Sequence, residues 1–139
     1  MSNTEPIELK AFVPAKDFEL SKQFYQDLGF TLCWGTEGDL AYFHYGDHGS
    51  HGKVGFLLQR FYVKELAENF MMHLLVKDVN AWWASIQDKK IIEKYGVHAE
   101  PPDDRPWHMR DFILSDPSGV LWRIAQDLPR NGEPAIDPD

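Results

Sequence analysis

The sequence has little cysteine, a shortage of cationic side chains and no long apolar segment, and each shortage excludes a class of protein. One cysteine, Cys33, stands among 139 residues, so neither an internal disulfide nor a cysteine-based zinc site can hold the fold together. Fourteen Lys and Arg stand against 22 Asp and Glu, which gives a net charge of −8. This balance argues against nucleic acid as a partner, because phosphates need a basic surface.

No stretch approaches the roughly 20 apolar residues of a membrane span, and the N-terminus lacks the basic and apolar regions of a secretion signal. We therefore expect a cytoplasmic protein without a membrane partner. Phosphate-binding glycine loops, serine-hydrolase elbows and H-E-x-x-H zinc motifs are also missing. Cys33 has no His–Asp partner at a recognisable spacing, and we expect an inert, buried thiol.

Aromatic residues, in contrast, are plentiful: nine Phe, five Trp and five Tyr make up 14% of the chain. This is more than ordinary packing of a domain of this size needs. The length is that of one domain with a hydrophobic core of its own. We expect a single domain over residues 1–128 and a proline-rich mobile tail at 129–139.

A weak internal repeat runs through the chain, with an offset of 61 residues between Asp17 and Asp78. Each aspartate stands where a helix N-cap belongs, between a strand-like apolar run and a helical pattern. The first helix is predicted over 18–28. The second is predicted over about 79–88, where apolar residues recur at i, i+3, i+4 and i+7 and form one stripe.

Strand-like segments surround both helices. They are predicted over residues 7–13, 30–34, 40–45, 54–59, 70–76, near 97–99, 109–115 and 120–126. Residues 60–69 are predicted as a polar linker with one helical turn, and residues 116–119 as a type I hairpin turn. Both halves are therefore predicted as βαβββ modules, module one over about 7–59 and module two over about 69–126, in an α+β fold.

Three stretches resemble the vicinal oxygen chelate superfamily, which includes glyoxalases, extradiol dioxygenases and bleomycin resistance proteins. They are V-P-A-K-D-F at 13–18 with F-Y and L-G-F after it, V-K-D-V at 76–79, and R-P-W-H-M-R-D-F at 105–112 followed by D-P-S-G. The likeness covers about residues 7–126 and is strongest to the bleomycin resistance proteins. It implies two curved mixed sheets, each with a helix on its convex face, a cleft, and a homodimer with two shared clefts.

Enzymes of this superfamily hold a divalent metal with His, Gln or Glu side chains from four strands. The resemblance places these positions at Lys10, Met71, Arg123 and within 55–58. Protonated Lys and Arg offer no lone pair and repel a dication, and no carboxylate or imidazole is available within 55–58. We therefore predict no metal, no other cofactor and no catalytic residues, and we favour binding over catalysis.

Strand alternation predicts which side chains line the cleft. Since the ligand positions face inward in this fold, Phe12 shares the cavity face of Lys10, and His73 shares that of Met71. His73 is then a proton acceptor, a hydrogen-bonding contact to the ligand or an ordinary sheet histidine. Trp122 points the other way and belongs to the core.

Phe43 and Tyr42 lie on opposite faces of the third strand, and the sequence does not decide which of them faces inward. Trp34 and Trp107 are candidates for stacking platforms at the rim of the cleft, and Trp107 matches the aromatic residue that bleomycin resistance proteins place beside their drug. The candidate ligand-binding residues are Trp107, Trp34, Phe43, Lys10, Phe12, His73 and Arg123.

The favoured function is sequestration of an aromatic or cationic antibiotic, similar to bleomycin, in a dimer cleft; the net charge of −8 fits a cationic ligand. A second possibility is a binder of a small acidic metabolite through Lys10 and Arg123. A third is a glyoxalase-like lyase or dioxygenase with an unusual metal set. Its ligands would come from His44, His48, His51 and His73. A glycine-rich hairpin with incidental imidazoles is the simpler interpretation of the run from 44 to 51.

Overall fold

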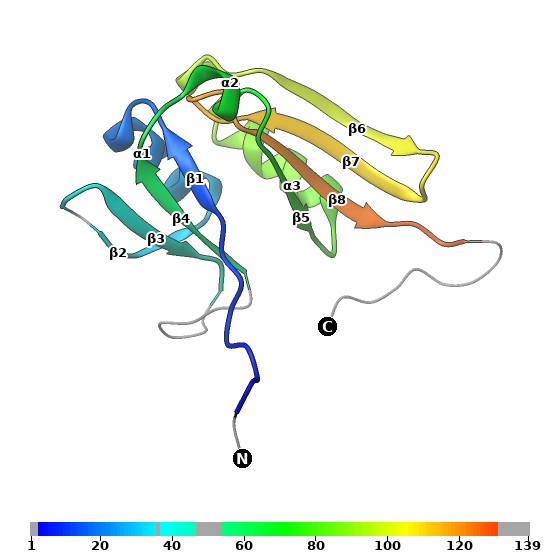
Figure 1. Ribbon diagram of the computed structural model, residues 1–139. Helices are drawn as coiled ribbons and strands as arrows, with labels where there is room; N and C mark the ends of the chain where they lie inside the picture. Colours follow the sequence, from blue (N-terminus) through cyan, green and yellow to red (C-terminus); the bar gives the residue numbers. More distant parts are fainter. Residues whose placement is uncertain (1–2, 36, 47–53, 131–139) are drawn as a thin grey trace.

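The computed structural model describes residues 3–35, 37–46 and 54–130 (Figure 1). His48, His51 and the tail beyond Arg130 lie outside the described residues. In chain order the elements are β1 (Phe12–Ala15), α1 (Phe18–Leu28), β2 (Thr31–Trp34), β3 (Leu40–His44), β4 (Gly55–Arg60), α2 (Lys64–Ala67), β5 (Met71–Leu75), α3 (Val79–Asp88), α4 (Ile91–Tyr95), β6 (Ala99–Arg105), β7 (Met109–Ser115) and β8 (Leu121–Asp127).

The strands form two four-stranded mixed sheets, one from each half of the chain (Figure 1). Their strand orders are β1-β4-β3-β2 and β5-β8-β7-β6. β1 runs parallel to β4, with Phe12 opposite Leu57, and β5 runs parallel to β8, with His73 opposite Arg123. The other neighbouring strands are antiparallel. The predicted α+β fold with two repeated modules is confirmed.

The two repeated helices begin at the predicted aspartates. The Asp17 carboxylate accepts a hydrogen bond from the backbone N–H of Leu20 at 3.1 Å, and that of Asp78 accepts one from Ala81 at 3.0 Å. These bonds satisfy backbone donors that have no partner inside the first helical turn. The N-caps therefore fix where the chain turns from strand to helix in both modules.

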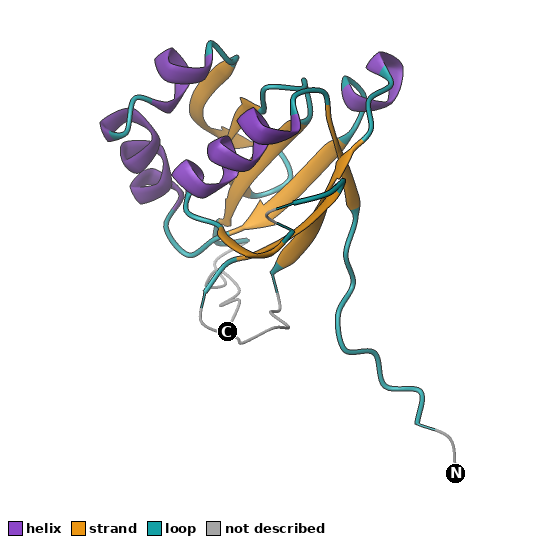
Figure 2. Ribbon diagram, turned by 90° about the vertical axis from the view of Figure 1, so that its left-hand side faces the viewer, coloured by secondary structure: helices purple, strands orange, loops and turns teal. Residues whose placement is uncertain are grey.

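The longer helices gather on one side of the strands (Figure 2), and the core lies between helices and sheets. On this helix-facing side Phe43 and Phe56 stack with ring centroids 5.4 Å apart, and Phe56 contacts Trp122 of the other sheet at 5.4 Å. Trp122 is 2% exposed, which confirms its predicted place in the core. Both sheets therefore contribute their helix-facing sides to one core.

We call the opposite side of each sheet its open face. Alternation and strand register place Phe12, Tyr42, His44 and Leu57 on the open face of the first sheet, and Met71, His73, Asp111 and Arg123 on that of the second.

A buried polar cluster joins the two modules. The hydroxyl of Tyr25 donates to the Asp116 carboxylate at 2.5 Å and accepts from the Trp122 indole N–H at 3.0 Å. Asp116 also accepts from the backbone N–H groups of Ser118 and Val120, which closes the hairpin between β7 and β8. Burial raises the pKa of Asp116, and burial followed by the charge of Asp116 raises the pKa of Tyr25 well above its ordinary value.

Three elements differ from the sequence prediction. The first strand begins at Phe12 and not at residue 7, and Ile7 and Leu9 are 80% and 94% exposed. Strand β6 extends to Arg105 although its residues 101 and 102 are prolines. It lies at the edge of its sheet, and its pairing with β7 shifts register between Glu100 and Asp103, so the two prolines stand where the regular ladder is interrupted. Helix α4 was not predicted. No helix of the described residues is long and apolar enough to cross a membrane.

Candidate functional site

The open face of the first sheet carries a buried acid that the sequence prediction missed. Only 2% of the Glu8 side chain is exposed. Its carboxylate accepts the hydroxyl hydrogen bond of Tyr42, with Oη at 2.8 and 3.0 Å from its two oxygens, and lies 3.2 Å from the Lys10 ammonium. Lys10 Nζ also lies 5.3 Å from the centroid of the Tyr42 ring. Lys10 is therefore already paired inside the chain.

Glycine at position 55 makes room for this carboxylate. A Cβ atom built on Gly55 would stand 2.6 Å from Glu8 Oε2, closer than side chains approach in proteins, and 3.1 Å from the Tyr42 ring. The segment before β1 can therefore lay its acid directly against β4. This close approach brings Glu8 next to Tyr42, which lies opposite Leu57, two residues after Gly55, on the same face of the sheet.

Aromatic rings surround the same place. The rings of Trp34 and Tyr42 lie 5.8 Å apart, and those of Tyr42 and His44 are stacked at 6.1 Å. His44 is 6% exposed, and its Nδ1 atom is buried without a hydrogen-bond partner among the described residues. Burial, and then the charge of Glu8, raise the pKa of the neighbouring Cys33 thiol, which is half-buried. The direction of this pKa agrees with the predicted inert character of the cysteine, whereas the prediction that it is buried is wrong.

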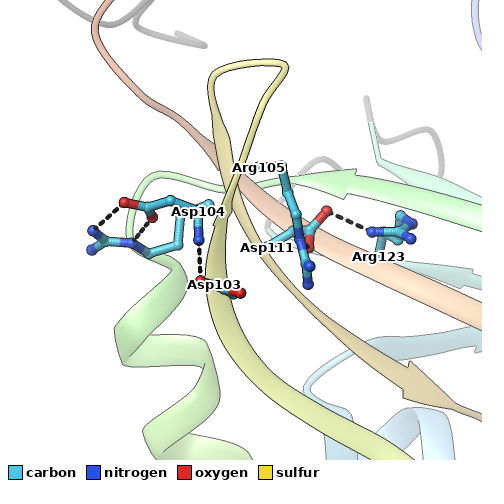
Figure 3. A network of polar contacts seen from close by, with 6 residues as sticks. Asp103, Asp104, Arg105, Asp111 and Arg123 are labelled. Carbon is cyan, nitrogen blue, oxygen red and sulfur yellow. Dashed lines mark hydrogen bonds and ion pairs between the residues drawn. The ribbon is translucent and has the colours of Figure 1, made fainter.

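The open face of the second sheet carries an ionic chain centred on Asp111 (Figure 3). The two oxygens of this carboxylate, which is 1% exposed, accept from Arg105 Nε at 2.7 Å and from Arg123 Nη1 at 2.9 Å. On the other side of the same hairpin Arg110 pairs with Asp104, the two atoms Nε and Oδ1 being 2.7 Å apart. Arg123 therefore has a buried counter-charge on its own sheet, as Lys10 has.

Trp107 lies in the turn between β6 and β7, and 49% of it is exposed. The Arg123 guanidinium stands 5.9 Å from the centroid of its ring. The turn is held by hydrogen bonds to the chain after β8: Leu128 donates to the His108 carbonyl at 2.9 Å and Arg130 to the Trp107 carbonyl at 3.2 Å. These bonds fix a large aromatic surface next to the Arg123 side chain.

Phe43 does not occupy the position that the candidate list gives it. It is fully buried on the helix-facing side of β3, against Phe56 and the ring of Tyr25 at 5.9 Å. The residues of β3 that belong to the open face are Tyr42 and His44, because Ala41 and Phe43 fill the core beneath α1. The correct choice between the two faces needs α1, whose packing the strand pattern by itself does not reveal.

The other six candidates divide between the two open faces and their margins. Lys10, Phe12 and Trp34 belong to the first sheet or to the segment before it, and His73, Trp107 and Arg123 belong to the second sheet and its turn. Phe12 is 51% exposed and Trp34 is 46% exposed. Both aromatic side chains are therefore accessible to a ligand or to another protein surface.

His73 borders a cavity of about 280 Å³ between β4 and β5. The other side chains around this cavity are apolar, Phe30, Phe56 and Leu75 among them. No group of three or more His, Cys, Asp or Glu that could hold a metal ion forms among the described residues. The structure therefore brings His73 to the border of an apolar cavity.

The four positions to which the resemblance assigns metal ligands do not fit a divalent ion. The register makes Leu57 the module-one counterpart of Arg123, because each lies opposite the equivalent residue of the first strand in its sheet. The donor set is then Lys10, Leu57, Met71 and Arg123. Two protonated cations, one alkyl group and one thioether do not match the oxygen and nitrogen ligands of such sites.

The sequence prediction missed the acids that pair with these cations. Asp111 was visible as a charged residue directly before the apolar run F-I-L of its strand, which is a signal for a paired buried charge. Glu8 gave no signal, because an acid at the start of a chain is normally solvated. Its burial depends on Gly55, which is distant in the sequence and close in the fold.

Comparisons with solved structures agree with this fold. The bleomycin-binding protein of Streptomyces verticillus, in complex with copper(II)-bleomycin, is 19% identical, with 94% of this chain and 100% of that chain covered and a TM-score of 0.67. An antibiotic-binding protein from Streptomyces sp. CB03234 is 23% identical, with 91% and 98% covered and a TM-score of 0.64. Lactoylglutathione lyase from Agrobacterium tumefaciens is 17% identical, with 90% and 95% covered and a TM-score of 0.58.

These structures have one fold and different functions, so the fold by itself does not decide between binding and catalysis. No curated protein sequence matches the chain. The family model described as Glyoxalase/Bleomycin resistance protein/Dioxygenase superfamily matches residues 9–124, which spans nearly all of both modules. The chain therefore belongs to the glyoxalase/bleomycin resistance protein/dioxygenase superfamily.

Proposed function

We propose that this protein binds a small-molecule antibiotic of aromatic or cationic character, similar to bleomycin, and sequesters it without a metal. The observation that carries the proposal is the internal pairing of both cations at the metal-ligand positions, Lys10 with Glu8 and Arg123 with Asp111. Such pairs leave no ligand set for metal chemistry, whereas the nearby exposed aromatic rings suit a flat ligand. Structural neighbours that bind bleomycin or another antibiotic support the same function.

We further propose that two copies form the binding clefts. The helix-facing sides of both sheets share one core, where Phe56 contacts Trp122, so the two open faces point away from that core and not toward each other. If the module-one face of one copy meets the module-two face of a second copy, two equivalent clefts form with twofold symmetry. Each cleft would then combine Trp34 and Phe12 with Trp107 of the other copy.

Tryptophan fluorescence titration with metal-free bleomycin tests this function. We expect saturable quenching at micromolar drug, and a loss of affinity of about tenfold in Trp107→Ala, because stacking on one aromatic ring contributes roughly 1–3 kcal/mol. The matched control is Trp83→Phe, since Trp83 packs against Phe112 beneath the sheet. Absence of quenching in the wild-type protein, or equal affinities of wild type and Trp107→Ala, would contradict the proposal.

The enzyme alternative is separated from this proposal by metal analysis of protein purified without a histidine tag. A stoichiometric transition metal in the purified protein would favour the enzyme alternative over sequestration. The acidic-metabolite alternative loses support because Lys10 and Arg123 do not form an uncompensated pair of cations; each contacts a carboxylate that is at most 2% exposed. With a net charge of −8, we also propose no nucleic-acid or membrane partner.

A further inference from the structure

The Lys10 ammonium makes, on the open face of the first sheet, the contacts that a bound cationic ligand would make. It is 3.2 Å from the Glu8 carboxylate and 5.3 Å from the centroid of the Tyr42 ring, a salt bridge and a cation–π contact at once. The side chain comes from the segment before β1 and is 26% exposed, so its flexible stem can swing into solvent without disturbing a strand. The ammonium is therefore held by contacts that another organic cation of similar size also makes.

The groups that hold this cation are built into the sheet independently of Lys10. Glu8 is fixed by the Tyr42 hydroxyl and by the space above Gly55. Trp34 extends the aromatic surface next to Tyr42. The imidazole ring of His44 stacks on the ring of the same tyrosine. The Nδ1 atom of His44, in a residue 6% exposed, has no partner among the described residues. When the ring proton is on Nε2, this atom accepts a hydrogen bond.

We propose that Glu8, Tyr42 and Trp34 form a subsite for an organic cation, an amine or a guanidinium, and that Lys10 occupies this subsite until the ligand displaces it. The inference rests on the proposed function, because the subsite lies on an open face that would line the cleft. Exchange of one cation for another leaves the buried Glu8 carboxylate paired throughout, so displacement uncovers no buried charge. Lys10 thereby sets how tightly any cationic ligand binds.

The effect of an internal competitor can be stated as an affinity ratio. The apparent dissociation constant equals the intrinsic one divided by the fraction of molecules in which the subsite is free. If Lys10 fills the subsite in about nine molecules of ten, its removal strengthens binding of a cation by about tenfold. An anion of the same shape gains nothing from this removal by competition, because Lys10 does not compete with it.

Nuclear magnetic resonance of ¹⁵N-labelled protein measures this ratio with two matched probes, phenethylammonium and 3-phenylpropionate. The indole N–H signal of Trp34, assigned with Trp34→Phe, reports occupancy next to the subsite. We expect Lys10→Met to bind phenethylammonium about tenfold more tightly than wild type does, with no gain for 3-phenylpropionate. Lys10→Gln, which keeps a donor beside Glu8, is a second variant should Lys10→Met fold poorly, and the same spectra show whether each variant is folded.

Two controls separate displacement from a general change of charge. Lys64→Met removes the same charge at an exposed site on α2, where Lys64 pairs with Glu68, and should leave both affinities unchanged. Glu8→Gln should weaken binding of phenethylammonium. Adding Lys10→Met to Glu8→Gln should give no gain in affinity, since the Lys10 ammonium and the ligand then have no Glu8 charge to compete for. An equal gain in Lys64→Met, an unchanged affinity in both Lys10 variants, or a full gain in the double variant would overturn the proposal.

The outcome is distinguishable from failure of the antibiotic function. Binding of phenethylammonium with the Lys10 effect, in a protein that does not bind bleomycin, would retain the subsite and reject that antibiotic. Binding of bleomycin that depends on Trp107 but is unaffected by Lys10→Met would retain the proposed function and reject the subsite.

Discussion

At the scale of single residues, carboxylates almost inaccessible to solvent hold the cations of both open faces. Glu8 meets Lys10 on one sheet, and Asp111 meets Arg123 and Arg105 on the other. A charge buried without a partner is costly, and removing one member of such a pair generally destabilises a protein more than the pair itself stabilises it. These cations are therefore parts of the fold as well as candidates for ligand contact.

Tyr25 gives a stability prediction with a defined pH dependence. In Tyr25→Phe the Asp116 carboxylate and the Trp122 indole N–H each lose a buried partner, and we expect a loss of about 1–3 kcal/mol in the free energy of unfolding at pH 7. Burial and the charge of Asp116 raise the folded-state pKa of Tyr25 well above 10. The stability from its neutral form is complete below the unfolded pKa of about 10 and is lost as the pH rises through the folded pKa.

The free energy of unfolding in urea, measured for wild type and Tyr25→Phe at pH 7 and at pH 10.5 to 11, checks this pH dependence. The gap between wild type and Tyr25→Phe should narrow as the pH rises, because only the wild type has this phenol to ionise. Tyr45→Phe, at a side chain 40% exposed, is the control and should follow the wild-type pH profile. A gap that stays constant or widens above pH 10 would show that Tyr25 does not titrate in this way.

At the scale of elements, the two helix N-caps are equivalent features of the repeat. Asp78 caps α3 through the backbone N–H of Ala81, and we expect Asp78→Ala to lower the free energy of unfolding by about 1 kcal/mol. Asp88→Ala at the other end of the same helix is the matched control, since an acid at a helix C-terminus interacts unfavourably with the helix dipole. Chemical denaturation should find Asp88→Ala neutral or slightly stabilising; equal losses in both variants would contradict the capping role.

Elements with a local cause could be predicted from the sequence, and those with a distant cause could not. Both capped helices, and strand β7, lie where the apolar period and the N-cap residues put them. Helix α4 was missed because its ends depend on left-handed residues, Lys90 and Gly96, in a polar stretch. The shift of β1 from residue 7 to Phe12 depends on where β4 begins to pair, which is a property of the folded sheet.

The candidate site divides in the same way. Alternation placed Phe12, His73 and Arg123 on one side of their strands and Trp122 on the other, as the structure has them. It could not choose between the faces of β3, which led to Phe43 as a candidate, and it could not find Glu8. Both of these depend on contacts between segments far apart in the chain, with α1 in one case and with Gly55 in the other.

At the scale of the whole molecule, the proposed dimer should depend on exposed apolar residues before β1. Leu9 is 94% exposed and Ile7 80%, which is unfavourable for a lone chain and suits burial against a second copy. We expect light scattering to give the mass of a dimer for wild type and of a monomer for Leu9→Asp at the same concentration. Leu66→Asp, at a leucine 44% exposed on α2, is the control and should remain dimeric. A monomeric wild-type protein would contradict the shared cleft.

The contact between Gly55 and Glu8 also has an evolutionary consequence. The two residues are 47 positions apart, yet a single added carbon at one of them would displace the carboxylate of the other from its present position. Among relatives, a side chain larger than hydrogen at position 55 and an acid at position 8 should therefore rarely occur together, and the two sites should vary as a pair. Relatives that have lost the glycine are expected to have lost the acid as well, and with it the reason to keep a lysine at position 10.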